Sequence, residues 1–214
     1  MLNYHSYKCS YTILCTKTGL EVSGSCDCKN VPWACKAFSE LKGELKKTLM
    51  DEFGCKCAFC QRSLSEDEKI VIDIEHILPK KKYINYTFDI RNLVLSCRRC
   101  NTGAQKGNRT DFIVNLIHGV NYNESVDFSV ANYLFIHPKF ENTYNYYKLI
   151  SIQIGQDVFR RYKVINNHSK LKYTFKFFNL KKLEIGSLDS CFGAPRHIVE
   201  TLKKERYANF PSTI

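Results

Sequence analysis

Two cysteine pairs enclose a histidine in the middle of this sequence. The first pair is "CAFC" at residues 57–60, the second is "CRRC" at residues 97–100, and "DIEHILPK" lies between them. Each C-x2-C pair presents two thiolates, and zinc prefers four such soft ligands in a tetrahedron, with each sulfur at about 2.3 Å from the ion. We therefore predict a structural Zn²⁺ site with the ligands Cys57, Cys60, Cys97 and Cys100.

The same cysteines have a plainer alternative. Free cysteine often behaves as a small buried apolar residue, so four unligated core thiols would also satisfy the sequence. The doubled x2 spacing favours the metal site over this alternative. Cys55 adds a further thiol two residues before Cys57, but Cys57 and Cys60 form the better-spaced pair.

Short strands and helical segments must position these residues. "KIVIDIEHI" at 69–77 is rich in branched residues and is closed by Pro79, which predicts a strand with His76 at its end. "RNLVLSC" at 91–97 predicts a second strand that returns to the cysteines, and "RRCNTGAQKGN" at 98–108 predicts a short helix. We expect a core of strand, loop, strand and helix.

An amphipathic helix is predicted before the first cysteine pair. In residues 31–54 the apolar side chains recur three to four positions apart, and Gly54 ends the pattern. These apolar positions are Phe38, Leu41, Leu45, Leu49 and Phe53.

The rest of the chain is expected to be an irregular lead-in and a C-terminal sheet with a helix. Residues 1–30 show little period and have room for one hairpin, and residues 111–120 look helical. Aromatic and branched runs at 144–154, 158–166 and 171–180 predict three antiparallel strands. A helical pattern begins at Pro195. The expected organisation is a lead-in (1–30), a core with the zinc site (31–118) and a region for partner docking or nucleic-acid binding (119–214).

Composition favours a soluble protein with a polyanionic partner. The 214 residues carry a net charge of +11 and are 44% apolar, so the chain can bury a sizeable core. Clustered Lys and Arg gain free energy by releasing counterions from a phosphate backbone, which favours nucleic acid. No stretch approaches the about 18 apolar residues of a membrane span, and the first residues lack the pattern of a secretory signal. We expect a cytoplasmic protein with reduced thiols. Free thiols are favoured over a second zinc site at Cys9, Cys15, Cys26, Cys28 and Cys35, because their spacings fit no regular zinc knuckle.

The enclosed segment resembles a known nuclease motif. "CAFC", "IEHILPK" and "NLVLSCRRCN" followed by Lys106 are similar to the HNH, or His-Me finger, endonuclease motif in its zinc-stapled form, over residues 55–108. The resemblance implies an α+β protein with a ββα-metal core, a four-cysteine zinc staple, an N-terminal helix and a C-terminal antiparallel sheet plus helix.

The resemblance implies a role for four residues. His76 would be the general base, and Glu75 and Asn101 would bind a catalytic divalent ion, Mg²⁺ or Mn²⁺. Asn92 would orient the loop that bears the histidine through backbone hydrogen bonds. The third motif position is Asn101 and not His, which makes this an H-N-N variant.

These residue types suit phosphodiester hydrolysis. A water must lose a proton while negative charge builds on the phosphoryl group and on the leaving 3′ oxygen, so a base and a cation are both needed. Histidine, with an ordinary pKa of about 6.5, accepts that proton at neutral pH. Carboxylate and amide oxygens are the ligands that Mg²⁺ prefers. Without the flanking cysteines, a Glu-His pair at a strand end would more often be a surface ion pair.

Basic residues near the motif are candidates for contacts with phosphates, although a solvated charged face is the alternative. The candidates are Lys80, Lys81, Lys82, Arg98, Arg99 and Lys106.

A wider resemblance points to anti-phage defence. "VPW" before the predicted helix, the motif itself and the downstream "YLFIHPKFENT" are similar to the HNH nuclease subunits of Septu-type systems, including retron-linked ones. This likeness implies a defence effector that works with an ATPase subunit of the SMC-like or ABC type, which holds the nuclease inactive until infection.

Two other classes stay open. A zinc-stapled nucleic-acid-binding module without catalysis would keep the cysteines but would have no reason to keep Glu75, His76 and Asn101 together. A stand-alone homing or restriction nuclease would need its own sequence-reading element, for which the aromatic strands are the candidates.

Overall fold

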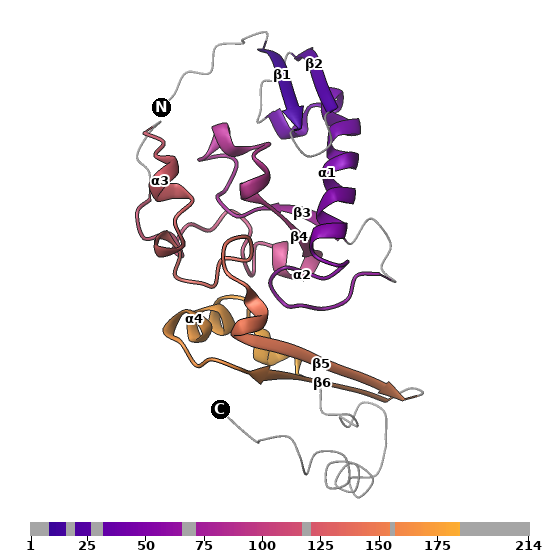
Figure 1. Ribbon diagram of the computed structural model, residues 1–214, viewed down its shortest axis with the longest axis vertical. Helices are drawn as coiled ribbons and strands as arrows, with labels where there is room; N and C mark the ends of the chain where they lie inside the picture. Colours follow the sequence, from indigo (N-terminus) through magenta and orange to yellow (C-terminus); the bar gives the residue numbers. More distant parts are fainter. Residues whose placement is uncertain are drawn as a thin grey trace, which may run out of the picture. The chain divides into compact units, whose positions relative to one another are not determined.

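The computed structural model contains helices together with small antiparallel sheets, as expected for the α+β class (Figure 1). It describes residues 9–15, 20–26, 32–65, 72–116, 121–154 and 157–184. The chain divides into two compact units, Met1–Asn132 and Tyr133–Ile214. No helix within these described ranges is long and apolar enough to cross a membrane.

A hairpin stands at the N-terminal end of the first unit. Strands β1 (Cys9–Cys15) and β2 (Leu20–Cys26) pair antiparallel, with Cys9 opposite Cys26. The hairpin considered for residues 1–30 is therefore present. Cys35 is disulfide-bonded, so the expectation of a free thiol is wrong for this residue. The side chains of the other four N-terminal cysteines lie outside the described part of the chain.

Helix α1 (Ser39–Glu52) precedes the first cysteine pair. It begins later than the apolar pattern suggested, because Cys35 has an extended backbone between two short 3-10 turns, Pro32–Ala34 and Lys36–Phe38. Its apolar stripe is buried, and α1 packs against strand β4 (Leu93–Cys97). The buried helix residues are Leu41, Leu45 and Leu49.

Strand β3 (Ile72–His76) pairs antiparallel with β4, and the four-residue helix α2 (Arg98–Asn101) follows β4 directly. In this register Ile72 lies opposite Cys97 and His76 lies opposite Leu93. Every β4 side chain is buried, which explains the unbroken apolar run "LVL" in the sequence. The two predicted strands and the short helix are thus present in the expected order.

The prediction of a helix at 111–120 is wrong for the described residues 111–116, which are turns and irregular chain. Phe112 and Ile113 are adjacent in sequence and both buried, and the amide of Val114 donates to the Asn132 carbonyl at 2.9 Å. The apolar pattern therefore reflects burial of an irregular segment, whereas helix α3 (Glu124–Asp127) lies further along the chain.

The second unit contains a two-stranded sheet and a helix. Strands β5 (Tyr147–Ile154) and β6 (Asp157–Val164) pair antiparallel as expected. The third predicted strand is instead helix α4 (Ser169–Phe177). The aromatic composition misled the prediction, because the buried residues Leu171, Thr174 and Phe177 recur every three positions and so share one helix face. The helical pattern from Pro195 falls outside the described residues.

Candidate active site

The four cysteines of the two C-x2-C pairs meet in one buried cluster. Their sulfur atoms all lie within 4.8 Å of one another, and Cys60 Sγ is 3.8 Å from Cys97 Sγ. Four sulfurs placed at about 2.3 Å from a zinc ion in a tetrahedron are separated by about 3.8 Å, so this donor set fits Zn²⁺. Cys55 is not a member of the cluster, as the spacing predicted.

Tight turns and one strand end hold the cluster together. Gly54, Cys55 and Gln61 adopt positive φ angles of 55°, 51° and 58°, which turn the chain sharply on both sides of the first pair. The amide of Ala58 donates to the Leu95 carbonyl at 2.9 Å and so attaches this turn to β4. The second pair needs no such device, because it lies where β4 ends and α2 begins.

The thiols of the cluster influence one another's protonation. The hydrogen bond with Cys100 lowers the pKa of Cys97 far below its usual range. Hydrogen bonds with Cys57 and Cys60 raise the pKa of Cys100 well above its usual value. The four sulfurs cannot all ionise side by side without a cation, which is what a zinc ion supplies.

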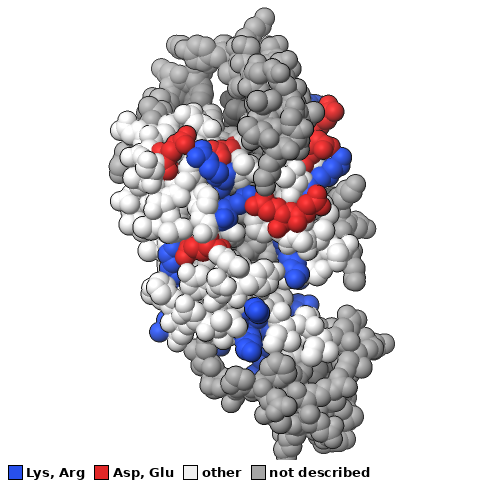
Figure 2. Space-filling model, viewed as in Figure 1, with Lys and Arg blue, Asp and Glu red and all other residues white. Residues whose placement is uncertain are grey.

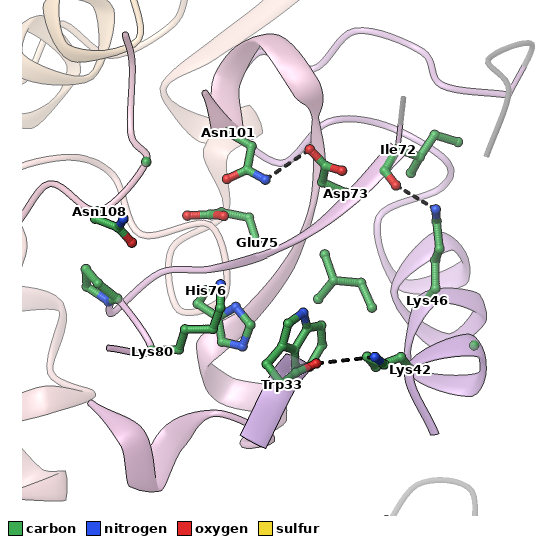
Figure 3. A pocket seen from close by; sticks show the side chains of 14 residues that line it. Trp33, Lys42, Lys46, Ile72, Asp73, Glu75, His76, Lys80, Asn101 and Asn108 are labelled. Carbon is green, nitrogen blue, oxygen red and sulfur yellow. Dashed lines mark hydrogen bonds between the residues drawn. The ribbon is translucent and has the colours of Figure 1, made fainter. Parts of the chain in front are cut away.

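Strand β3 carries three polar residues into a pocket with a volume of about 580 Å³ (Figure 3). Asp73 and Glu75 are two positions apart and share one face of the strand, and His76 is at its end. Asn101 of α2 lines the same pocket, so the structure brings together three of the four predicted catalytic residues. The remaining wall includes Trp33, Lys42, Lys46, Lys80 and Asn108.

His76 has one tethered ring nitrogen and one without a partner. Its Nε2 lies 2.9 Å from the Thr87 carbonyl oxygen, which can only accept, so Nε2 carries the hydrogen. Nδ1 therefore has a lone pair, and it has no hydrogen-bond partner among the described residues. Burial, and then the positive charge of Lys80, lower the pKa of His76 to about 3. The ring is a neutral potential base at physiological pH.

Asn92 ties the loop after His76 to the segment before β4. Its Oδ1 accepts from the Leu78 amide at 2.7 Å, and its Nδ2 donates to the carbonyls of Leu78 and Tyr86, each at 3.1 Å. The Asn92 carbonyl also accepts from the Ile77 amide at 2.9 Å. Because Asn92 is buried and all its polar atoms are bonded, it fixes the backbone that follows the histidine.

The oxygen-bearing side chains of the pocket include one that the sequence analysis missed. Asn101 Nδ2 donates to Asp73 Oδ2 at 3.0 Å, and Figure 3 shows the amide oxygen turned away from Asp73. Burial raises the pKa of Glu75, while the charge of Lys106 opposes this effect. Asp73, Glu75 and Asn101 together offer hard oxygen ligands that fit Mg²⁺ or Mn²⁺. The alternation of a strand was the signal that could have pointed to Asp73.

Lys106 was expected to contact phosphates, but the structure places it in the interior. Its side chain is fully buried, and its Nζ donates to Glu75 Oε1 and to the carbonyl oxygen of His76. Burial lowers the pKa of Lys106, and the Glu75 carboxylate opposes this. The lysine thus forms an internal ion pair that bridges a candidate ion ligand and the backbone of the candidate base.

The other predicted basic contacts lie nearer the surface. Lys80 lines the pocket, whereas Lys81, Lys82, Arg98 and Arg99 are exposed or half-buried and do not line it. Figure 2 shows that, on one face, the described Lys and Arg side chains are scattered and form no single basic surface there.

Comparison with known proteins identifies the same segment. Residues 57–109 match the family model of the HNH endonucleases, so this segment is similar to an HNH endonuclease domain. The chain is also 40% identical, over 60 residues, to the Septu protein PtuB of Bacillus thuringiensis. That alignment covers 28% of this chain and 23% of the relative, so it spans less than a quarter of the relative's length. No solved structure gives a significant match. The HNH resemblance and the Septu link are both confirmed.

Proposed function

We propose that this chain is a metal-dependent endonuclease that hydrolyses the phosphodiesters of DNA. One observation carries the proposal: His76 Nδ1, with its free lone pair, belongs to a side chain that lines the same pocket as Glu75 and Asn101. In this proposal β3, β4 and α2 form a ββα-metal core, and Zn²⁺ at the four cysteines holds the two strands and the helix together. The zinc does not touch the substrate.

His76 serves as the general base. Its Nδ1 takes a proton from a water molecule as the water oxygen forms a bond to phosphorus, and the bond from phosphorus to the 3′ oxygen breaks. The leaving oxygen takes a proton from solvent, and the imidazolium later returns its proton to solvent. The Thr87 carbonyl supports this role because it keeps the hydrogen on Nε2 and leaves Nδ1 as the acceptor.

Glu75 and Asn101 hold the catalytic divalent ion in this proposal. When bound, Mg²⁺ or Mn²⁺ supplies positive charge that stabilises the charge developing on the phosphoryl group and the 3′ oxygen. Asp73 orients the Asn101 amide, since its carboxylate can accept only from Nδ2 and thereby leaves Oδ1 for the ion. Lys106 fixes one oxygen of Glu75 in place.

Asn92 acts on His76 only through the backbone. Its bonds to Leu78 and Tyr86 hold the loop that follows the histidine, so the ring keeps its distance from Thr87. Phosphates of the substrate are contacted by Lys80, Lys81, Lys82, Arg98 and Arg99, and the net charge of +11 supports a polyanionic partner.

The biological role we propose is that of an anti-phage defence effector that works with an ATPase subunit. The similarity to the Septu protein PtuB supports this role, although it covers only 28% of the chain. Residues 133–214 form a separate compact unit and are our candidate for the surface that binds the ATPase. A stand-alone nuclease is the second candidate, and cleavage by the purified chain alone would favour it.

A cleavage assay on the purified chain tests the proposal. Single- and double-stranded DNA and RNA are incubated with and without Mg²⁺, alone and with the co-encoded ATPase if one exists. We expect ion-dependent cleavage of DNA that His76→Ala abolishes without loss of zinc or of folding. Failure of every substrate under all these conditions would favour the non-catalytic zinc-stapled binding module.

A further inference from the structure

One wall of the pocket comes from residues that precede the HNH match. Trp33 lies in the 3-10 turn Pro32–Ala34, and Lys42 and Lys46 lie on α1, whereas the family match begins at residue 57. All three line the pocket that contains His76 and Glu75 (Figure 3). The pocket therefore has an acidic wall on β3 and an aromatic and basic wall before it in sequence.

Trp33 is placed beside the candidate base. The indole meets the His76 ring edge to face, with centroids 4.5 Å apart, and it packs at 5.4 Å from Phe88. The side chain is half-buried and lines the pocket, and Lys42 Nζ lies over the indole ring at 5.9 Å from its centroid. An indole next to a hydrolytic centre suits a nucleobase, because base-aromatic stacking contributes about 1–3 kcal/mol per base in single-strand binding.

Lys42 and Lys46 are held beside the pocket by backbone carbonyls. Lys42 Nζ donates to the carbonyls of Trp33 at 3.2 Å and Cys35 at 3.4 Å, and Lys46 Nζ donates to the Ile72 carbonyl at 2.6 Å. Their spacing of four places both on one side of α1. These contacts position two positive charges where a phosphate would enter.

Lys47 of the same helix provides the contrast. It pairs with Glu44, and its side chain is 73% exposed to solvent. It does not line the pocket. The orientation of Lys42 and Lys46 is therefore a property of their helix face and not of the lysine content of α1.

We propose that Trp33, Lys42 and Lys46 form a nucleotide subsite, which binds an unpaired nucleobase and its phosphate next to the phosphodiester that is cut. The base stacks on the indole, and the two ammonium groups contact the phosphate. The inference rests on the proposed nuclease function and names its substrate class, which is single-stranded or locally unpaired DNA. Bases inside a duplex are stacked on each other and cannot offer a face to Trp33.

The chain supplies its own probe for this subsite, since Trp33 is its single tryptophan. Oligothymidylate is titrated into the wild-type protein without added Mg²⁺ or Mn²⁺, so that no cleavage occurs, while tryptophan emission is recorded. An abasic oligonucleotide of equal length keeps the phosphates and removes the bases, and a duplex keeps both but hides the base faces. We expect strong quenching by oligothymidylate and little by the other two.

Variants measured by fluorescence anisotropy of a labelled oligothymidylate complete the test. Trp33→Leu should weaken binding about 5- to 150-fold, the effect of losing one stacked base. Trp33→Phe keeps an aromatic face and the packing on His76, and it should lose less. Lys42→Gln and Lys46→Gln should each weaken binding several-fold and reduce its dependence on salt, whereas Lys47→Gln should bind as the wild type does.

Three results would overturn the subsite: equal quenching by the abasic strand, unchanged binding by Trp33→Leu, or preference for the duplex. Zinc content and circular dichroism of each variant are compared with the wild type, and the wild-type quenching by oligothymidylate against the abasic strand decides the matter if Trp33→Leu does not fold. Cleavage of a duplex that depends on His76, together with normal binding by Trp33→Leu, would remove the subsite and leave the nuclease. Base-dependent quenching without any cleavage would keep the subsite and remove the proposed nuclease function.

Discussion

His76 and His137 are alike in their exposed fraction, in the direction of their pKa shift and in their contact with an aromatic ring. His76 lies in the first unit and His137 in the second, and they are 2% and 0% exposed. Burial is the main cause that lowers the pKa of each to about 3. Each ring meets an aromatic edge, Trp33 at 4.5 Å for His76 and Tyr133 at 4.3 Å for His137. A depressed pKa therefore does not distinguish a base from a packed histidine.

The hydrogen bonds of the two rings make the difference. His137 Nδ1 accepts from the amides of Lys139 and Phe140, each at 3.3 Å, so the hydrogen of this neutral ring is on Nε2. The nitrogen without a partner in the described residues is then an N–H in His137 but a lone pair in His76. The unpartnered nitrogen of His137 already carries a hydrogen and cannot take a proton, whereas the unpartnered nitrogen of His76 can. Only His76 also shares a pocket with Glu75 and Asn101.

The largest effect should come from breaking the zinc staple. Cys97→Ala removes a ligand from the cluster at the end of β4, the strand that pairs with β3 and so positions His76. We expect loss of bound zinc and of the folded first unit, because structural zinc contributes on the order of 10 kcal/mol to small zinc domains. Metal analysis by mass spectrometry should give about one zinc per wild-type chain, and circular dichroism should follow the fold.

Cys55→Ala is the matched control for that prediction. Cys55 lies in the turn that precedes the first cysteine pair but outside the cluster, so this variant should keep its zinc. A wild-type protein that is well folded and free of zinc would contradict the staple.

Exchange of each histidine tests the comparison directly. His76→Ala should reduce cleavage about 10²- to 10⁴-fold, the usual contribution of a general base, and leave DNA binding and zinc content intact. His137→Ala should keep cleavage per folded molecule. It should instead lower the free energy of unfolding by about 1–3 kcal/mol, because the amides of Lys139 and Phe140 lose their acceptor. Initial cleavage rates and urea unfolding separate the two outcomes; equal rates for His76→Ala and the wild type would remove the proposed mechanism.

A smaller and reversible effect is expected for Glu75→Ala. Loss of this carboxylate should weaken the catalytic ion, so cleavage at low Mg²⁺ should fall and recover in part at high Mg²⁺ or Mn²⁺. His76→Ala should not recover, because extra ion does not replace a base. The measurement is cleavage rate against ion concentration, and a Glu75→Ala curve that coincides with the wild type would argue against the ion site. Lys106→Met tests the same ion site, since it removes the ion-pair partner that fixes the Glu75 carboxylate.

The sequence predicted the features that depend on residue spacing. It missed contacts between residues that are far apart in the sequence. The C-x2-C pairs fixed the cluster, because two short knuckles have few ways to close on one ion. Lys106 was expected on the surface. Its ion pair with Glu75 joins residues far apart in sequence, so the sequence pattern did not reveal that the lysine is buried. The segment now known as α4 was predicted as a strand, because its aromatic composition was given more weight than its period of three. No role was predicted for Trp33, since only the folded chain places its ring beside His76.

The smallest effect concerns the stability of the second unit against pH. His137 titrates at about 3 when folded and at about 6.5 when unfolded, so between these values the unfolded chain binds one more proton than the folded chain. Stability therefore decreases as the pH falls below about 6.5, by up to about 1.4 kcal/mol per pH unit from this histidine.

His137→Asn isolates that contribution, because an asparagine can still accept from the amides of Lys139 and Phe140 but does not titrate. Urea unfolding of both proteins is followed by circular dichroism from pH 8 to pH 5. The difference between their free energies of unfolding should stay constant from pH 8 to 7, where the histidine is neutral in both states. It should then shift in favour of the variant by about 1 kcal/mol or more between pH 6 and 5. A constant difference over the whole range would mean that His137 takes up a proton in the folded state as readily as in the unfolded chain. The lowered pKa would then not be shared by His76 and His137.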